Sequence, residues 1–153
     1  GLPAMVDAEK EFRSMLGRAL LDHGADQSAV HVLMSVLEGD RTHASSAALY
    51  SKLLAREGHI EEAVGLVLGA AAQQPKCKEL KELLATMSDD PKLRAALLDQ
   101  IHSLGDHCAQ VAAFTAAAVK DYGRVPLSLE LFTLASQREP RNPSYALSVA
   151  HTA

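Results

Sequence analysis

The chain has 153 residues, which is enough for about one domain with a sizeable core. Apolar residues make up 48% and charged residues 22% of it, so the composition excludes a disordered or a fibrous protein. The formal net charge is −4 and the basic residues form no stripe, so we expect neither nucleic acid nor an anionic membrane as a partner.

Helices are expected to follow one another along the chain with short breaks. No segment alternates apolar and polar residues in the way that predicts a strand. No apolar run approaches the ~20 residues that a helix needs to span a bilayer. The predicted helices cover about 7–22, 27–37, 45–56, 60–73, 76–87, 91–104, 106–122, 126–139 and 143–153.

Capping residues, prolines and glycines predict where these helices begin and end. Asp7 is expected to cap the first helix, because its carboxylate can accept otherwise unpaired amide protons. Asp90-Pro91 and Asn142-Pro143 each combine a capping side chain with a proline in the first turn, which is a strong start signal. Helix capping also explains the Asp89-Asp90 pair better than acid–base chemistry does.

Glycines and small residues recur with a period of about 34 residues. When the segment from residue 10 is laid over the segment from residue 44, Gly24 falls on Gly58 and Ala29 falls on Ala63. A third copy begins at residue 109 and has Gly123 in the place of Gly58. A fixed period of this length predicts a helical solenoid, in which each copy buries its apolar face only against its neighbours.

The paired helices resemble the tetratricopeptide repeat, whose pattern is W-x2-L-G-x2-Y, then A-x3-F, then a closing P over 34 residues. The copy at 44–77 matches best, with Gly58-His59-Ile60-Glu61-Glu62-Ala63 and a closing Pro75. The copy at 10–43 has Leu16-Gly17 but no closing proline. The predicted copies are 10–43, 44–77, a degenerate 78–108, 109–142 and a partial 143–153.

The resemblance implies an all-α fold, a right-handed α-α superhelix of about four helix pairs plus the opening helix of a fifth. We therefore expect residues 1–153 to form a single helical-repeat domain. The chain stops inside the last predicted helix, so we expect it to be a fragment of a longer protein. The last segment is expected to pack back on the helix before it.

In the tetratricopeptide family, the first helix of each pair lines a concave groove that holds a partner segment. The corresponding residues alternate apolar side chains with cations, which fits a partner segment with apolar anchors and acidic residues. An alternative interpretation stays open, in which the apolar members are ordinary core residues and the cations are solvated. The predicted partner-binding residues are Met15, Arg18, Leu49, Lys52, Arg56, Phe114 and Lys120.

These observations predict a protein–protein interaction scaffold or adaptor without catalysis. The alternative is a self-associating or regulatory helical module within a larger assembly or enzyme, and the end helices offer a route to homo-oligomers. An enzyme would need convergent polar side chains in a deep pocket, and no catalytic motif is present. We expect no cofactor.

Histidine and cysteine residues give no support for a metal site or a disulfide framework. His102, His107 and Cys108 form the only tight cluster, but their spacing does not suit the paired ligands of zinc. Cys77 and Cys108 are far apart and are interpreted as free thiols of a reducing compartment. We therefore predict an intracellular, most simply cytoplasmic, protein.

Overall fold

The computed structural model describes residues 2–153, with side chains from residue 6 onward, and this part of the chain is helical throughout, without a strand. The predicted all-α helical-repeat fold is confirmed. Contacts divide the chain into two compact units, one ending at Gln74 and one beginning at Pro75. Unit 1 contains α1 (Leu2–Asp22), α2 (Asp26–Gly39), α3 (Ala44–Arg56) and α4 (Ile60–Gln73). Unit 2 contains α5 (Lys78–Met87), α6 (Pro91–His102), the 3-10 turn η1 (Gly105–His107), α7 (Cys108–Asp121), α8 (Val125–Arg138) and α9 (Pro143–Thr152).

Three predicted helix starts differ from the structure by two or more residues, and one of them is the helix predicted from residue 76, which begins at Lys78. Helix α1 already begins at Leu2, so Asp7 lies inside the helix and the prediction that it caps α1 is wrong. Pro3 is compatible with this longer helix, because a proline in the first turn forfeits no internal hydrogen bond. The helix predicted from residue 106 begins instead at Cys108, after the 3-10 turn. The predicted caps Asp90 and Asn142 are confirmed, since each side chain accepts a backbone N–H of the first turn.

Three hairpin turns share one backbone geometry. In each, a glycine ends the first helix with a positive φ, and the following residue donates its N–H to the carbonyl five positions earlier. An L-residue in this left-handed conformation costs about 1–2 kcal/mol, which explains why glycine recurs there. The glycines are Gly24, Gly58 and Gly123, with φ of 78°, 89° and 83°. The hydrogen bonds are Ala25 to Leu20 (2.8 Å), His59 to Leu54 (2.8 Å) and Arg124 to Val119 (3.0 Å).

Close helix packing builds the core of unit 1. Helix α1 contacts both α2 and α3, and α3 contacts α4. Gly17 in α1 lies against Leu33 in α2, where an added Cβ would meet the Leu33 Cδ2 at 2.7 Å. Leu33, Leu49 and Leu53 form a buried cluster, so a residue without a side chain at position 17 lets α1 approach this core.

Polar side chains contact polar groups about one period away in sequence within unit 1. The contacting residues are from 30 to 32 positions apart. Gln74 Nε2 donates to the carbonyl of Thr42. The ion pairs are Lys10 Nζ to Asp40 Oδ2 (3.3 Å) and Arg56 Nη2 to Asp26 Oδ2 (2.7 Å).

Unit 2 replaces one glycine turn with a different arrangement. The break between α5 and α6 has no positive-φ glycine; Asp89 instead pairs with Arg124 of a later turn, with Oδ2 and Nη2 2.6 Å apart. Helix α5 contacts α7, α7 contacts α8, and α8 contacts α9. The expectation that the last segment packs on the preceding helix is confirmed. Its Leu147 keeps 58% of its surface exposed.

Candidate functional site

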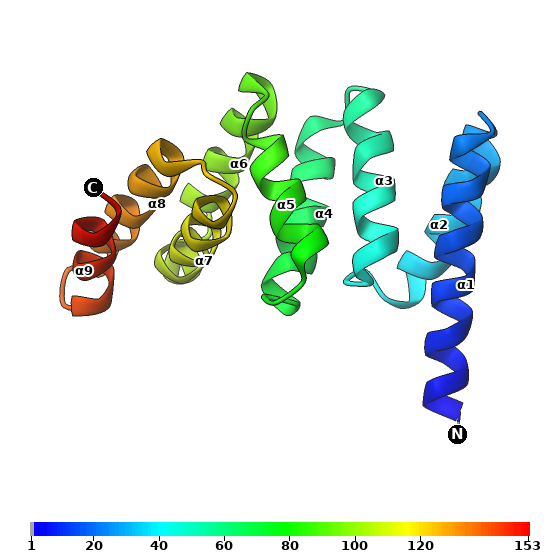
Figure 1. Cartoon of the computed structure of the whole chain (residues 1–153), viewed down its shortest axis with the longest axis horizontal. Helices are drawn as coiled ribbons and strands as arrows, with labels where there is room; N and C mark the ends of the chain where they lie inside the picture. Colours follow the sequence, from blue (N-terminus) through cyan, green and yellow to red (C-terminus); the bar gives the residue numbers. More distant parts are fainter. Residues whose placement is uncertain (1) are drawn as a thin grey trace. The chain divides into compact units, whose positions relative to one another are not determined.

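The first helices of unit 1, α1 and α3, lie side by side and carry most of the predicted partner-binding residues (Figure 1). Met15, Arg18, Lys52 and Arg56 are all exposed. We call these four residues the first-helix face of unit 1. Met15 is 68% exposed, which is a large fraction for an apolar side chain.

Leu49, the apolar residue predicted for the same face on α3, lies in the core. Its side chain is 5% exposed and belongs to the cluster with Leu33 and Leu53. Leu49 therefore exposes almost no surface to a ligand, which agrees with the interpretation that it is an ordinary core residue.

Other apolar side chains on α1 extend the exposed surface around Met15. Phe12 is 65% exposed and Leu16 is 41% exposed. Helical spacing puts Phe12, Met15 and Leu16 within one sector of α1.

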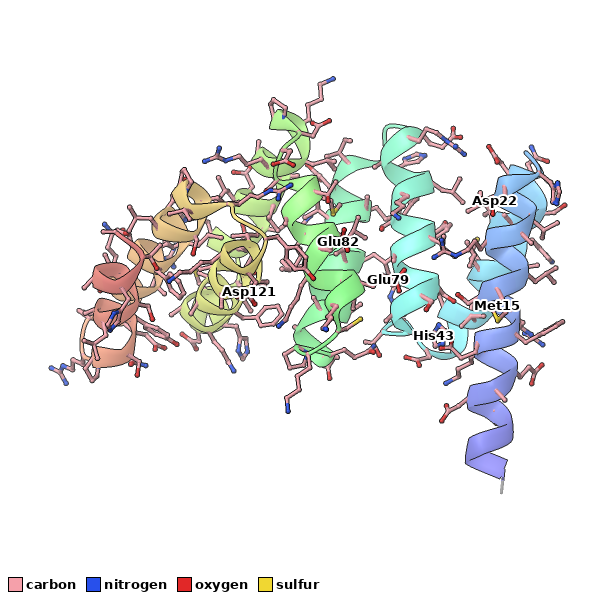
Figure 2. All side chains as sticks on the ribbon, in the orientation of Figure 1. Met15, Asp22, His43, Glu79, Glu82 and Asp121 are labelled. Carbon is pink, nitrogen blue, oxygen red and sulfur yellow. The ribbon has the colours of Figure 1, made fainter. Side chains whose placement is uncertain are left out.

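Charges of both signs surround the first-helix face. Arg56 is paired with Asp26, and Glu11 Oε1 lies 2.8 Å from His43 Nε2. Lys52 makes no ion pair with any residue that the structure describes. Figure 2 shows Met15 and Asp22 on α1, and helical spacing puts Glu11, Met15, Arg18 and Asp22 on one stripe.

The predicted residues of unit 2 are in different surroundings. Phe114 is half-buried on α7. Lys120 is exposed, but its Nζ donates to Thr152 Oγ1 of α9 at 3.2 Å, so this cation is engaged within the unit.

The first helices of unit 2, α5 and α7, carry acidic and basic side chains in equal number. Figure 2 shows Glu79 and Glu82 on α5 and Asp121 on α7. The Asp121 carboxylate lies 3.8 Å from Lys81 Nζ. Glu79 and Glu82 have the i, i+3 spacing of neighbours on one side of a helix, which is visible in the sequence.

A small pocket in unit 1 was also missed by the sequence analysis. It has a volume of about 100 Å³ and opens among α2, α3 and α4. The side chains that line it are Met34, Leu37, Glu38, Arg41, Tyr50, Leu54, Glu62 and Leu66. Residues of three helices line the pocket, so the sequence pattern of any single helix does not indicate it.

Tyr50 is the polar group of this pocket that is most withdrawn from water. Burial raises the pKa of its phenol above the usual range, the negative charge of Glu62 raises it further, and Arg41 offsets part of this rise. Tyr50 and Leu54 precede Lys52 and Arg56 by two positions on α3. Two residues are about 200° of helix rotation, so the pocket and the first-helix face use opposite sides of α3.

Metal-binding clusters and membrane-spanning helices are absent from the described residues. Among residues 2–153, no group of three or more histidine, cysteine, aspartate and glutamate side chains is arranged to hold a metal ion. In the same part of the chain, every helix is too short or too polar to cross a membrane. Cys77 is half-buried, Cys108 is buried, and both are free thiols.

Comparisons with known proteins identify no family for this chain. No family model matches the sequence, and no curated protein matches it. Among solved structures, the chain is similar to PilF of Pseudomonas aeruginosa, with 18% sequence identity and a TM-score of 0.48. The matched region covers 96% of this chain and 68% of that one.

Proposed function

We propose that the chain is a protein–protein interaction scaffold or adaptor of tetratricopeptide type, and that a partner segment binds along its first helices. The observation that carries the proposal is the exposed apolar sector of α1 with cations beside it. An apolar surface rimmed by polar residues marks an interaction site, because its burial by a partner is favourable. Met15 at 68% and Phe12 at 65% exposure are the anchors of this surface.

The partner segment is apolar with some acidic residues. Met15 and Phe12 would supply most of the binding energy, because buried apolar anchors dominate interfaces. Arg18, Lys52 and Arg56 would set orientation and association rate, as charges at a rim do. We include Phe114 and Lys120 of unit 2 in the proposal as a separate contact with the partner. Leu49 stabilises the first-helix face from its position in the core.

The module is proposed to be non-catalytic and to work inside the cell, in the cytoplasm. The free thiols of Cys77 and Cys108 support the second point, since reducing compartments keep cysteines unpaired.

Self-association is the second candidate function. It is supported by exposed apolar side chains on both end helices, with Met15 on α1 and Leu147 on α9. Sedimentation of the chain against concentration tests it. A concentration-dependent dimer that Met15→Glu or Leu147→Glu abolishes would favour self-association, and a strict monomer would rule it out.

The partner-binding proposal is tested by selecting binders from a random displayed-peptide library and measuring their affinity by fluorescence anisotropy. We expect selected peptides to combine apolar and acidic residues. Met15→Glu should weaken them at least about tenfold, which corresponds to about 1.4 kcal/mol. Val125→Glu is the matched control, because Val125 is an exposed apolar residue on α8, which is the second helix of its pair. Peptides that bind equally well to the Met15→Glu variant would refute the proposal.

A further inference from the structure

The pocket among α2, α3 and α4 has walls suited to an aliphatic chain. Met34, Leu37, Leu54 and Leu66 supply its apolar lining. Its volume of about 100 Å³ is smaller than the roughly 150 Å³ of an apolar cavity that accepts benzene. A slender methylene chain therefore fits the pocket better than an aromatic ring does.

The charged groups of the pocket come from two sides. Glu38 belongs to α2 and Glu62 to α4, and neither makes an ion pair with another described residue. Arg41, between α2 and α3, is the cation among the lining residues, so the three charges sum to −1. A ligand that brings a positive charge would balance this sum, whereas an anion would meet two carboxylates.

Tyr50 adds a third polar element to the same pocket. Its half-buried phenol ring presents a π-face and a hydroxyl oxygen, both of which favour a nearby cation. The lining thus combines apolar side chains with two carboxylates and a phenol. Long basic side chains have the matching form, because they bury their stem and keep the charge at one end.

We propose that this pocket is a socket for a long basic side chain, lysine or arginine, of a partner protein. The methylene stem lies along Leu37, Leu54 and Leu66, and the cation lies among Glu38, Glu62 and the Tyr50 phenol. The socket goes beyond the proposed function, because it uses the opposite side of α3 and selects the opposite charge from the first-helix face. A partner segment of each kind could therefore bind unit 1 independently.

The test uses the full chain and small mimics of the basic side chains. Binding of n-butylammonium and n-butylguanidinium is measured from the NMR shift of the ¹³C-labelled Met34 methyl group, because Met34 lines the pocket and is 41% exposed. The matched probes are n-butanol, which has the same stem without charge, and butyrate, which has the opposite charge. We expect the two cations to bind at least about threefold more tightly than n-butanol, and butyrate to bind most weakly.

Two variants should change the affinity for n-butylammonium in opposite directions. Glu62→Gln removes a carboxylate and should weaken binding about threefold, whereas Arg41→Gln removes the competing cation and should strengthen it by a similar factor. Glu57→Gln is the control, since Glu57 is an exposed carboxylate that directly follows α3 and lies outside the pocket. A two-dimensional amide spectrum establishes that each variant is folded. Because Arg41 lies outside the helices, its variant keeps the test valid even where Glu62→Gln perturbs the start of α4.

Three results would overturn the socket. Equal binding of n-butanol and n-butylammonium would make it a purely apolar crevice. Preferred binding of butyrate would make it an anion site at Arg41. The absence of any Met34 shift with the cations would show that the pocket accepts neither side chain.

Discussion

The two units reverse the chain between paired helices in different ways. In unit 1 both helix pairs reverse at a glycine turn, at Gly24 and Gly58, whose geometry is fixed by residues next to it in sequence. In unit 2 the pair α7–α8 uses the same turn at Gly123, but the break between α5 and α6 depends on Asp89, Asp90 and the distant Arg124. A helical repeat can therefore lose its glycine where a cap and a long-range ion pair hold the chain instead.

The first helices of the two units also differ in their exposed apolar surface. Helix α1 of unit 1 exposes the large apolar side chains of Phe12 and Met15, whereas α5 and α7 of unit 2 expose no large apolar side chain. Because apolar anchors dominate the binding energy of interfaces, this difference favours unit 1 for the proposed partner segment.

The largest expected effect on stability comes from substitutions in the core of each unit. Leu33→Ala in unit 1 and Leu131→Ala in unit 2 each remove a fully buried side chain and should each lower the free energy of unfolding by about 2–5 kcal/mol. Because contacts concentrate within each unit, amide hydrogen exchange should rise mainly in α1–α4 for the first variant and in α5–α9 for the second. An equal rise throughout the chain in both variants would contradict the division.

The shared turn geometry predicts equal costs in the two units. Gly24→Ala and Gly123→Ala each place a Cβ at positive φ with no neighbouring atom within 4 Å, so strain alone decides the outcome. Each should lower the free energy of unfolding by about 1 kcal/mol in chemical denaturation. Gly69→Ala is the control, since Gly69 lies inside α4 with open space around it and should stabilise by up to about 1 kcal/mol. A cost at only one of the two turns would mean that they are not equivalent.

Unit 2 contains a buried hydroxyl without a hydrogen-bond partner, unlike the buried serines Ser51 and Ser128. Thr115 Oγ1 has no hydrogen-bond partner, whereas the hydroxyls of Ser51 and Ser128 donate to backbone carbonyls, both at 2.8 Å. Thr115→Val keeps the shape and removes the unpaired group, so it should raise the free energy of unfolding by about 1 kcal/mol. Thermal denaturation measures this effect, and a loss of stability would show that the hydroxyl has a role in the fold.

The smallest effect concerns acid stability in unit 1. Burial raises the pKa of Asp40, but hydrogen bonds from Thr42 and Lys10 outweigh it and bring the pKa below its usual 3.8. A lowered folded-state pKa stabilises the fold above about pH 4 and loses this contribution as the pH falls below that value. Asp40→Asn should therefore cost about 0.5 kcal/mol at pH 7 and almost nothing near pH 2, as measured by urea denaturation. A cost that persists unchanged at pH 2 would assign it to packing.

Local signals in the sequence were sufficient for the helices and turns but not for the surfaces. The recurrence of Gly24, Gly58 and Gly123 and the Asp90-Pro91 start act through neighbouring residues, so the pattern predicts them correctly. The prediction that Asp7 caps the first helix was wrong because a residue type that favours capping does not show that the chain before it is non-helical.

The candidate sites depend on which helices meet, and this the sequence pattern does not contain. Leu49 lies next to Lys52 on the helical wheel, yet its side chain enters the core while Lys52 remains exposed. Glu38, Tyr50 and Glu62 line the pocket from three different helices, so no helical spacing in the sequence connects them. Such a site becomes visible only when the helices are placed together.

One NMR experiment tests the central claim that unit 1 has two separate binding surfaces. The chain contains four methionines, of which Met15 lies on the first-helix face, Met34 lines the pocket, and Met87 in unit 2 is buried at 6% exposure. In a ¹³C-methyl-labelled chain, we expect a selected acidic, apolar peptide to shift Met15 and leave Met34 unchanged. We expect n-butylammonium to do the reverse, and Met87 to stay constant with both. Shifts of both exposed methionines with either ligand, or of neither, would contradict the account.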